Sequence, residues 1–176
     1  MTRGFRFLTM IVLAAGAMAY SPVQAATPEE GAAEAARAWA AAIMARDVEA
    51  QMKLLPAAMY PKPGERERQR LLRLHDKERA IINNHKYLSF DVRAPSQTLK
   101  VNKTTAVVLP YRAVLSTAEG KLQTDSVLIA LSEEGSNQWS VFDGSGYVAR
   151  SLKPLIPGYT TGLGVPAAVT KLIKGE

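Results

Sequence analysis

The residues of this chain that are best placed to do acid–base chemistry start with Asp125. On the same side of a predicted strand, at every second position, follow Val127, Ile129 and Leu131. If that side lines an apolar interior, burial disfavours the charged carboxylate and raises its pKa. An acid tuned in this way suits proton transfer near neutral pH.

Tyr111 is the natural companion of this acid. A short turn at residues 118–120 predicts a hairpin that places Tyr111 on the strand next to that of Asp125. A carboxylate that moves a proton and a phenol that stabilises negative charge on oxygen would suit an isomerase or dehydratase. His75 is a third candidate, although adjacent helical residues such as Asp76 do not face it. An enzyme would therefore use Asp125, Tyr111 and His75.

Other kinds of site find little support. His75 and His85 are ten positions apart, whereas helical metal ligands come three or four apart, so no metal site is predicted. The chain has no cysteine, which removes disulfides and thiol chemistry. It also has no glycine-rich phosphate loop, and we predict no cofactor.

The first 25 residues are typical of a secretory signal peptide. Arg3 and Arg6 precede an apolar run over residues 7–19, and Val23 and Ala25 supply small residues before a cleavage site. The run is too short for a permanent membrane span. We therefore expect cleavage after Ala25 and a periplasmic or secreted protein.

Composition limits the partners of the mature chain. Of the 176 residues, removal of the signal leaves 151, enough for one domain without covalent cross-links. Without Arg3 and Arg6, 20 basic residues face 16 acidic ones, a net charge of +4. The densest basic stretch, residues 66–79, is interleaved with acids, so nucleic-acid binding is not expected.

Helical signals fill the first half of the mature chain. Thr27, Pro28 and Glu30 predict a helix start, with the helix running to about Arg46. Asp47 predicts the cap of a second helix that Pro56 ends. A third, charged helix is expected from about residue 65, with its apolar stripe reaching His85. The side of the first helix expected to be buried carries Ala32, Ala36, Trp39, Ala40 and Ile43.

Residues with strand propensity follow from Tyr87 onward. The predicted strands, joined by short turns into an antiparallel meander, are 87–94, 97–102, 104–117, 121–132 and 137–142. Pro110 cannot donate a ladder hydrogen bond and should bend its strand. We predict an α+β fold in which the N-terminal helices pack in the concave face of a bent antiparallel sheet. Turns and short helices are expected after Asp143.

This order of elements, closed by Trp139, Phe142, Asp143 and Gly144, resembles the nuclear transport factor 2-like group of cystatin-like folds. Its small exported bacterial members are the nearest in pattern. The resemblance implies a cone-shaped domain over residues 26–157 with an apolar cavity, followed by a tail, 158–176, that packs on it or trails from it. It also implies possible dimers through the outer sheet face.

Two functional interpretations follow. The favoured one is an exported, non-catalytic binding or interaction module whose partner is a small apolar ligand or another periplasmic protein. Its cavity would be lined by Trp39, Tyr60 and Tyr111, with Trp139 buried where sheet and helices meet. The alternative is the cofactor-free isomerase or dehydratase described above. Two ionisable groups in one cavity would distinguish the enzyme.

Overall fold

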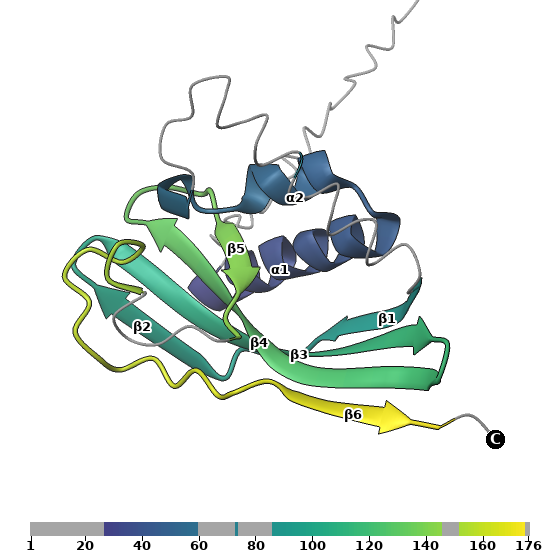
Figure 1. Ribbon diagram of the computed structural model, residues 1–176. Helices are drawn as coiled ribbons and strands as arrows, with labels where there is room; N and C mark the ends of the chain where they lie inside the picture. Colours follow the sequence, from purple (N-terminus) through teal and green to yellow (C-terminus); the bar gives the residue numbers. More distant parts are fainter. Residues whose placement is uncertain (1–26, 60–72, 74–85, 146–151, 175–176) are drawn as a thin grey trace, which may run out of the picture.

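A computed structural model describes residues 27–59, 73, 86–145 and 152–174. Two helices pack against a six-stranded antiparallel sheet (Figure 1), which confirms the α+β prediction. Of the predicted third helix, only Arg73 is described, and it is helical, whereas Tyr60, His75 and His85 lie outside the described residues. Among the described helices, none combines the length and the apolar character that crossing a membrane requires.

The two helices begin where their capping residues predict. In α1 (Pro28–Ala45), the Thr27 hydroxyl accepts from the Glu30 amide, and the Glu30 carboxylate accepts from the Thr27 amide, forming a capping box. The Asp47 carboxylate accepts from the Ala50 amide and caps α2 (Val48–Leu54). A short 3₁₀ turn, η1 (Ala57–Met59), follows. Local hydrogen-bond chemistry therefore sets these helix starts.

Two long strands form the centre of the sheet. They are β3 (Thr104–Thr117) and β4 (Gly120–Glu133), paired along their whole length. The flanking strands are β1 (Lys86–Val92), β2 (Gln97–Val101), β5 (Ser140–Asp143) and β6 (Val169–Ile173). Both β1 and β2 pair with β3, end to end, so the meander prediction is wrong for this first pair. On the other edge, β5 and β6 share β4 in the same way.

Both edges of the central pair are interrupted at one level, which we call the waist. It is the row in which Pro110 of β3 faces Val127 of β4. The Pro110 carbonyl accepts from the Arg93 amide at 2.8 Å, so its ring nitrogen, which has no hydrogen, points to the same edge. Neither β1 nor β2 pairs with β3 at Pro110, so the amide hydrogen that proline lacks is not needed for a hydrogen bond between strands. On the opposite edge, the Gly144 amide donates to Val127 between β5 and β6.

Each face of the sheet has its own apolar cluster. The side facing α1, here the helix face, contributes Val107, Leu109, Tyr111, Ala113, Leu128, Ala130 and Val141, which pack with Ala32, Ala36 and Trp39. The outer face contributes Ala106, Ile129, Leu131 and Phe142, covered by Leu152, Ile156 and Tyr159. Because side chains alternate along a strand, β3 and β4 supply both clusters.

The segment 152–165 covers the outer face and is held by polar contacts. The Asn102 side chain donates to the Pro157 carbonyl at 3.0 Å. A side chain at Gly158, whose φ is +83°, would collide with Asn102. The chain then forms β6, a strand that the sequence analysis did not predict. The tail thus adds both a cover and an edge strand.

Ile156→Ala tests the outer cover. The side chain is fully buried, so its truncation should lower the free energy of unfolding by about 2–5 kcal/mol. Urea denaturation followed by circular dichroism measures the change, with the exposed Lys153→Ala as the control. A loss no larger than that of the control would show that the segment does not stabilise the sheet.

Candidate functional site

Asp125 lies on the outer face, away from α1. It shares that face with Ile129 and Leu131, as expected, but lies beyond the part that residues 152–165 cover. Its carboxylate accepts two hydrogen bonds from the Arg112 guanidinium, at 2.8 and 3.2 Å. Arg112 therefore holds the pKa of Asp125 below its usual range, with smaller help from Gln123. The predicted rise in the pKa of Asp125 is wrong, because the apolar face it shares is not the helix face.

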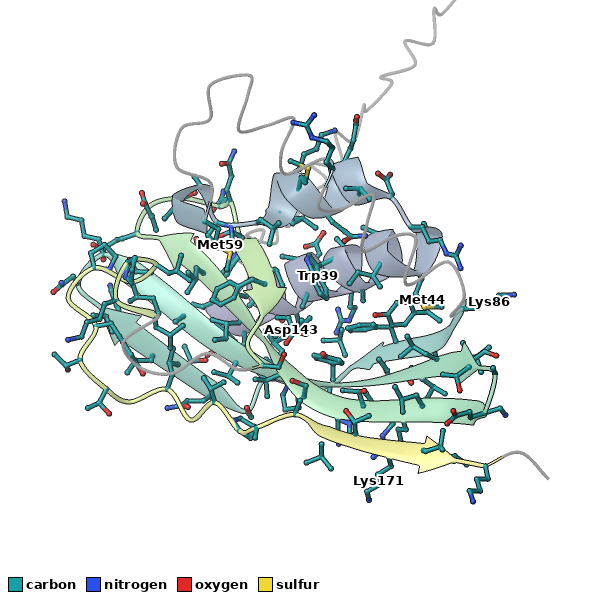
Figure 2. All side chains as sticks on the ribbon, viewed as in Figure 1. Trp39, Met44, Met59, Lys86, Asp143 and Lys171 are labelled. Atoms are coloured by element: carbon teal, nitrogen blue, oxygen red, sulfur yellow. The ribbon has the colours of Figure 1, made fainter. Side chains whose placement is uncertain are left out.

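Tyr111 lies on the helix face, so the structure does not bring it together with Asp125. It pairs instead with Asp143, at the end of β5: the phenol donates to Asp143 Oδ2 at 2.9 Å. Asp143 Oδ1 accepts from the Ser145 amide at 2.8 Å. Figure 2 shows Asp143 and Trp39 in the layer between α1 and the sheet. A phenol–carboxylate pair is therefore present, but with a different acid.

An aromatic row flanks this pair. Phe90 stacks on Tyr111 with ring centroids 4.5 Å apart, and the Tyr87 and Trp39 rings lie 6.2 and 5.8 Å from Phe90. Residues 87 and 90 share the helix face only because a β-bulge at Leu88 interrupts the alternation of β1. Burial and then the charge of Asp143 raise the pKa of Tyr111 and, less strongly, that of Tyr87. Both phenols therefore stay protonated at neutral pH.

One buried polar atom on this side, the indole nitrogen of Trp39, has no hydrogen-bond partner among the described residues. Trp39 is only 8% exposed. The hydroxyl of Ser126, a residue 6% exposed, hydrogen-bonds to the Tyr111 phenol and opposes part of the rise in its pKa. Ser126 pairs directly with Tyr111 across β3 and β4, next to the waist. An unpaired buried polar group costs about 1–3 kcal/mol, so the fold retains the unpaired indole of Trp39 near the aromatic row at a measurable cost.

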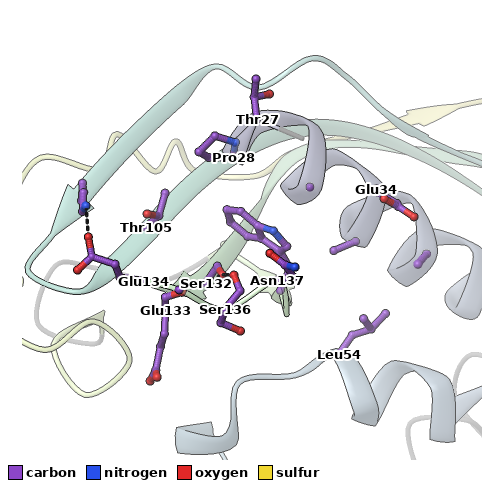
Figure 3. A pocket seen from close by; sticks show the side chains of 16 residues that line it. Thr27, Pro28, Glu34, Leu54, Thr105, Ser132, Glu133, Glu134, Ser136 and Asn137 are labelled. Atoms are coloured by element: carbon purple, nitrogen blue, oxygen red, sulfur yellow. Dashed lines mark hydrogen bonds and ion pairs between the residues drawn. The ribbon is translucent and has the colours of Figure 1, made fainter. Parts of the chain in front are cut away.

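A hollow of about 710 Å³ lies beside the first turns of α1. Figure 3 shows its walls converging from the first turns of α1, from Leu54 of α2 and from the β4–β5 connection. Its polar and charged lining includes Glu34, Lys100, Ser132, Glu133, Glu134, Ser136 and Asn137, beside Trp139. The volume is within the range of roughly 300–1,000 Å³ that small-molecule sites occupy.

The charges of this hollow are unbalanced. Lys100 Nζ lies 2.6 Å from Glu134 Oε1, and both side chains are more than half exposed. No basic side chain of the described residues forms an ion pair with Glu34 or Glu133. The four charged side chains of the lining therefore sum to −2, in a chain whose net charge is +6.

Trp139 packs where α1 meets the sheet, as predicted, but it is only half-buried. A Cβ at Gly31 would lie 2.5 Å from Trp139 Nε1, so the missing side chain of Gly31 admits the indole. The remaining exposed part of the ring contributes to the hollow. An aromatic surface thus lies beside carboxylates.

The residues predicted to line a cavity lie elsewhere. Trp39 and Tyr111 are buried in the helix-face cluster, and neither lines the hollow. From the sequence, Asp143 is named only in the motif that closes the predicted strands and not as a site residue. Asp143 follows Val141 by two residues, which indicates that both side chains lie on the same face of β5. Which face of the sheet that is depends on the pairing of β4 with β5. Within the described ranges, no three metal-ligating side chains come together.

Comparison with known proteins yields no relative: no family model, curated protein or solved structure matches the chain.

Tyr111→Phe tests the phenol–carboxylate pair. Removing a hydrogen bond to a charged group should lower stability at pH 7 by about 1.5–3 kcal/mol. Because the pKa of Tyr111 is raised by folding, the wild-type protein gains stability from the neutral phenol below about pH 10 and loses it as the pH rises further. Urea denaturation at pH 7, 9 and 11 measures both effects. Wild type and variant losing equal stability between pH 9 and 11 would contradict the assignment.

Trp139→Ala tests the packing at the rim of the hollow. A buried tryptophan contributes about 3–5 kcal/mol, so this half-buried one should contribute less, about 2 kcal/mol. Trp139→Phe keeps most of the apolar contact with α1 and should cost about half as much. Thermal unfolding measures both. An unchanged melting temperature for Trp139→Ala would show that the indole does not hold the connection against α1.

Proposed function

We propose that this protein is an exported, non-catalytic binding module that holds a small, positively charged ligand in the hollow. The carrying observation is the pair of carboxylates, Glu34 and Glu133, that have no basic partner among the described residues and lie in one hollow with Trp139. Carboxylates attract a cation, and an indole face adds a cation–π contribution. Because the lining of the hollow is largely polar, we propose a charged ligand in place of the apolar ligand expected from the sequence.

The cone-shaped, nuclear transport factor 2-like architecture belongs to this proposal. Its support is the curved sheet with α1 on one face (Figure 1) and the order of elements along the chain. Export rests on the signal-peptide pattern of the first 25 residues. A protein partner, or a homodimer through the outer sheet face, is the other form that a binding module could take.

An enzymatic role has weaker support. Asp125 is paired with Arg112 on the outer face, and Tyr111 already donates its proton to Asp143. A phenol with a raised pKa is also a weaker donor to negative charge developing on a substrate oxygen. The geometry therefore favours binding over an isomerase or dehydratase mechanism.

Titration with two probes of equal length and opposite charge tests the proposal. Cadaverine, a dication, should change the fluorescence of Trp139 in a Trp39→Phe background, whereas glutarate, a dianion, should not. Glu34→Gln and Glu133→Gln should each weaken cadaverine binding by about fivefold, the loss of roughly 1 kcal/mol. Glu119→Gln, an exposed acid in the β3–β4 turn, is the matched control.

Equal responses to cadaverine and glutarate, or equal effects of the three glutamate variants, would overturn the cationic ligand. Native mass spectrometry of protein recovered from the periplasm tests the remainder. A mass that begins at Ala26 and carries a retained small molecule would support export and binding. A companion chain in its place would show an interaction module.

A further inference from the structure

The strand β6 forms an open edge of the sheet. It pairs with β4 alone, and no other strand of the described residues lies against its outer side (Figure 1). Every residue of β6 is exposed. An open edge presents unpaired backbone groups, to which a further strand can bind. The edge of β6 is therefore a candidate docking surface for an extended segment.

Two residues of β6 direct their backbone groups away from the sheet. Successive residues of an antiparallel strand turn their N–H and C=O groups to opposite edges. The Val127 carbonyl accepts from the Gly144 amide, so alternate residues of β4, counted back from Val127, face the edge that β6 occupies. The residues paired with them bond to β4, and those between, Thr170 and Leu172, do not. Their N–H and C=O groups are available to a further strand.

Apolar side chains flank this edge. Of the five large hydrophobic residues that the described structure exposes, three belong to β6: Val169, Leu172 and Ile173, at 52%, 43% and 46%. Val169 and Ile173 lie on the outer face of the sheet, and Leu172 lies on the helix face. A strand added to the edge would cover part of all three and gain hydrophobic stabilisation from their burial.

The charge along this edge is positive. Lys171 is the middle residue of β6, Lys174 follows the strand, and Lys121 lies beside them on β4. Figure 2 shows Lys171 on the side of the sheet away from α1. No acid of the described residues forms an ion pair with these lysines, and Asp125, on the same face of β4, is already bound by Arg112. An acidic partner therefore complements the edge.

A second copy of this chain fits the edge less well. Antiparallel pairing of β6 with its own copy over the full strand would place two copies of Lys171 opposite each other. Like charges directly opposite each other destabilise a strand pair. Pairing centred on Leu172 avoids that contact but uses only residues 171–173 of each strand.

We propose that the edge of β6 binds an extended, acidic segment of another protein, which adds to the sheet as a further antiparallel strand. Backbone hydrogen bonds to Thr170 and Leu172 fix its register. A carboxylate opposite Lys171 supplies the complementary charge, and apolar residues two positions to either side of it cover Val169 and Ile173. The inference does not rest on the ligand proposed for the hollow, because no residue of β6 lines the hollow.

A hexapeptide with blocked ends, Glu-Val-Leu-Glu-Thr-Val, is the probe. Paired antiparallel with residues 169–174, it places its two glutamates opposite Lys174 and Lys171. Amide hydrogen exchange of the full ¹⁵N-labelled chain, followed by nuclear magnetic resonance, reports its binding. At saturation, the Thr170 and Leu172 amides should exchange at least about tenfold more slowly. The Lys171 amide, which already bonds to β4, should change little.

Reversal of charge tests the side-chain contact. Replacing both glutamates of the peptide by lysine should weaken its binding to the wild-type protein by about fivefold. Lys171→Glu should reverse this preference, so that the variant binds the lysine peptide more tightly than the glutamate peptide. Lys153→Glu makes the same change of charge at an exposed position outside β6 and is the matched control, which should keep the wild-type preference.

Thr170→Pro tests the backbone contact. The proline ring removes the N–H that points away from the sheet and leaves the bonds between β6 and β4 in place, so the strand should remain folded. Peptide binding should fall by about tenfold, because one hydrogen bond is lost and the ring occupies its place. Thr170→Ala keeps the N–H and should bind as the wild-type protein does.

Unchanged exchange at Thr170 and Leu172 with the peptide present, or equal binding of the glutamate and lysine peptides, would overturn the proposal. So would slow exchange of these two amides without peptide that strengthens with protein concentration, because a second copy would then occupy the edge. Faster exchange of the Lys171 amide in Thr170→Pro would show that this variant has lost β6. The preference of Lys171→Glu then decides the question.

Discussion

The antiparallel ladder between β3 and β4 is the constraint on which the rest of the structure depends. Each strand has 14 residues, and they pair from the hairpin turn to the far end. Each outer edge of this pair is occupied by two short strands that meet at the row of Pro110 and Val127. A proline interior to a strand is tolerated here because its neighbouring edge is already open. The sheet can therefore change direction at the waist without losing a ladder bond.

The two faces of this ladder have different covers, and this decides which side chains can meet. α1 packs across the helix face, while residues 152–165 cover the outer face on one side of the waist. Asp125 lies on the uncovered side and is balanced by arginines. Tyr111 and Asp143 lie on the helix face, where burial strengthens their mutual interaction. The polar side chains of Tyr111 and Asp143 therefore lie next to the waist on the helix face.

Much of this fold follows from local sequence signals. Thr27 and Asp47 each accept a backbone amide within their own helix turn, so the helix starts could be predicted without knowledge of the fold. The long strands were found from their β-branched residues and their turns. The strand β6 was missed because Val169–Ile173 is short and exposed, with a place in the sheet that depends on β4, more than 40 residues earlier.

The candidate sites depended on information that no local pattern contains. Alternation correctly placed Asp125 with Ile129 and Leu131, but both faces of β4 are apolar, and the pattern does not say which one α1 covers. Likewise, Asp143 meets Tyr111 only through the pairing of β4 with both β3 and β5. Glu34 and Glu133 come from different halves of the chain. The sequence identified Tyr111 as a candidate, whereas its partner Asp143 could be recognised only from the strand register.

The acids of the described structure divide by whether a basic side chain already balances them. Asp125 binds Arg112, and Glu134 binds Lys100, so these carboxylates have little attraction left for a ligand. Asp143 has only uncharged donors, and its negative charge persists beside aromatic rings. A cation gains most from a carboxylate that is partly desolvated and uncompensated, since solvent and counter-charges weaken any other. In a chain of net positive charge, the unbalanced carboxylates of the hollow, Glu34 and Glu133, are the basis of the proposed binding of a small cation.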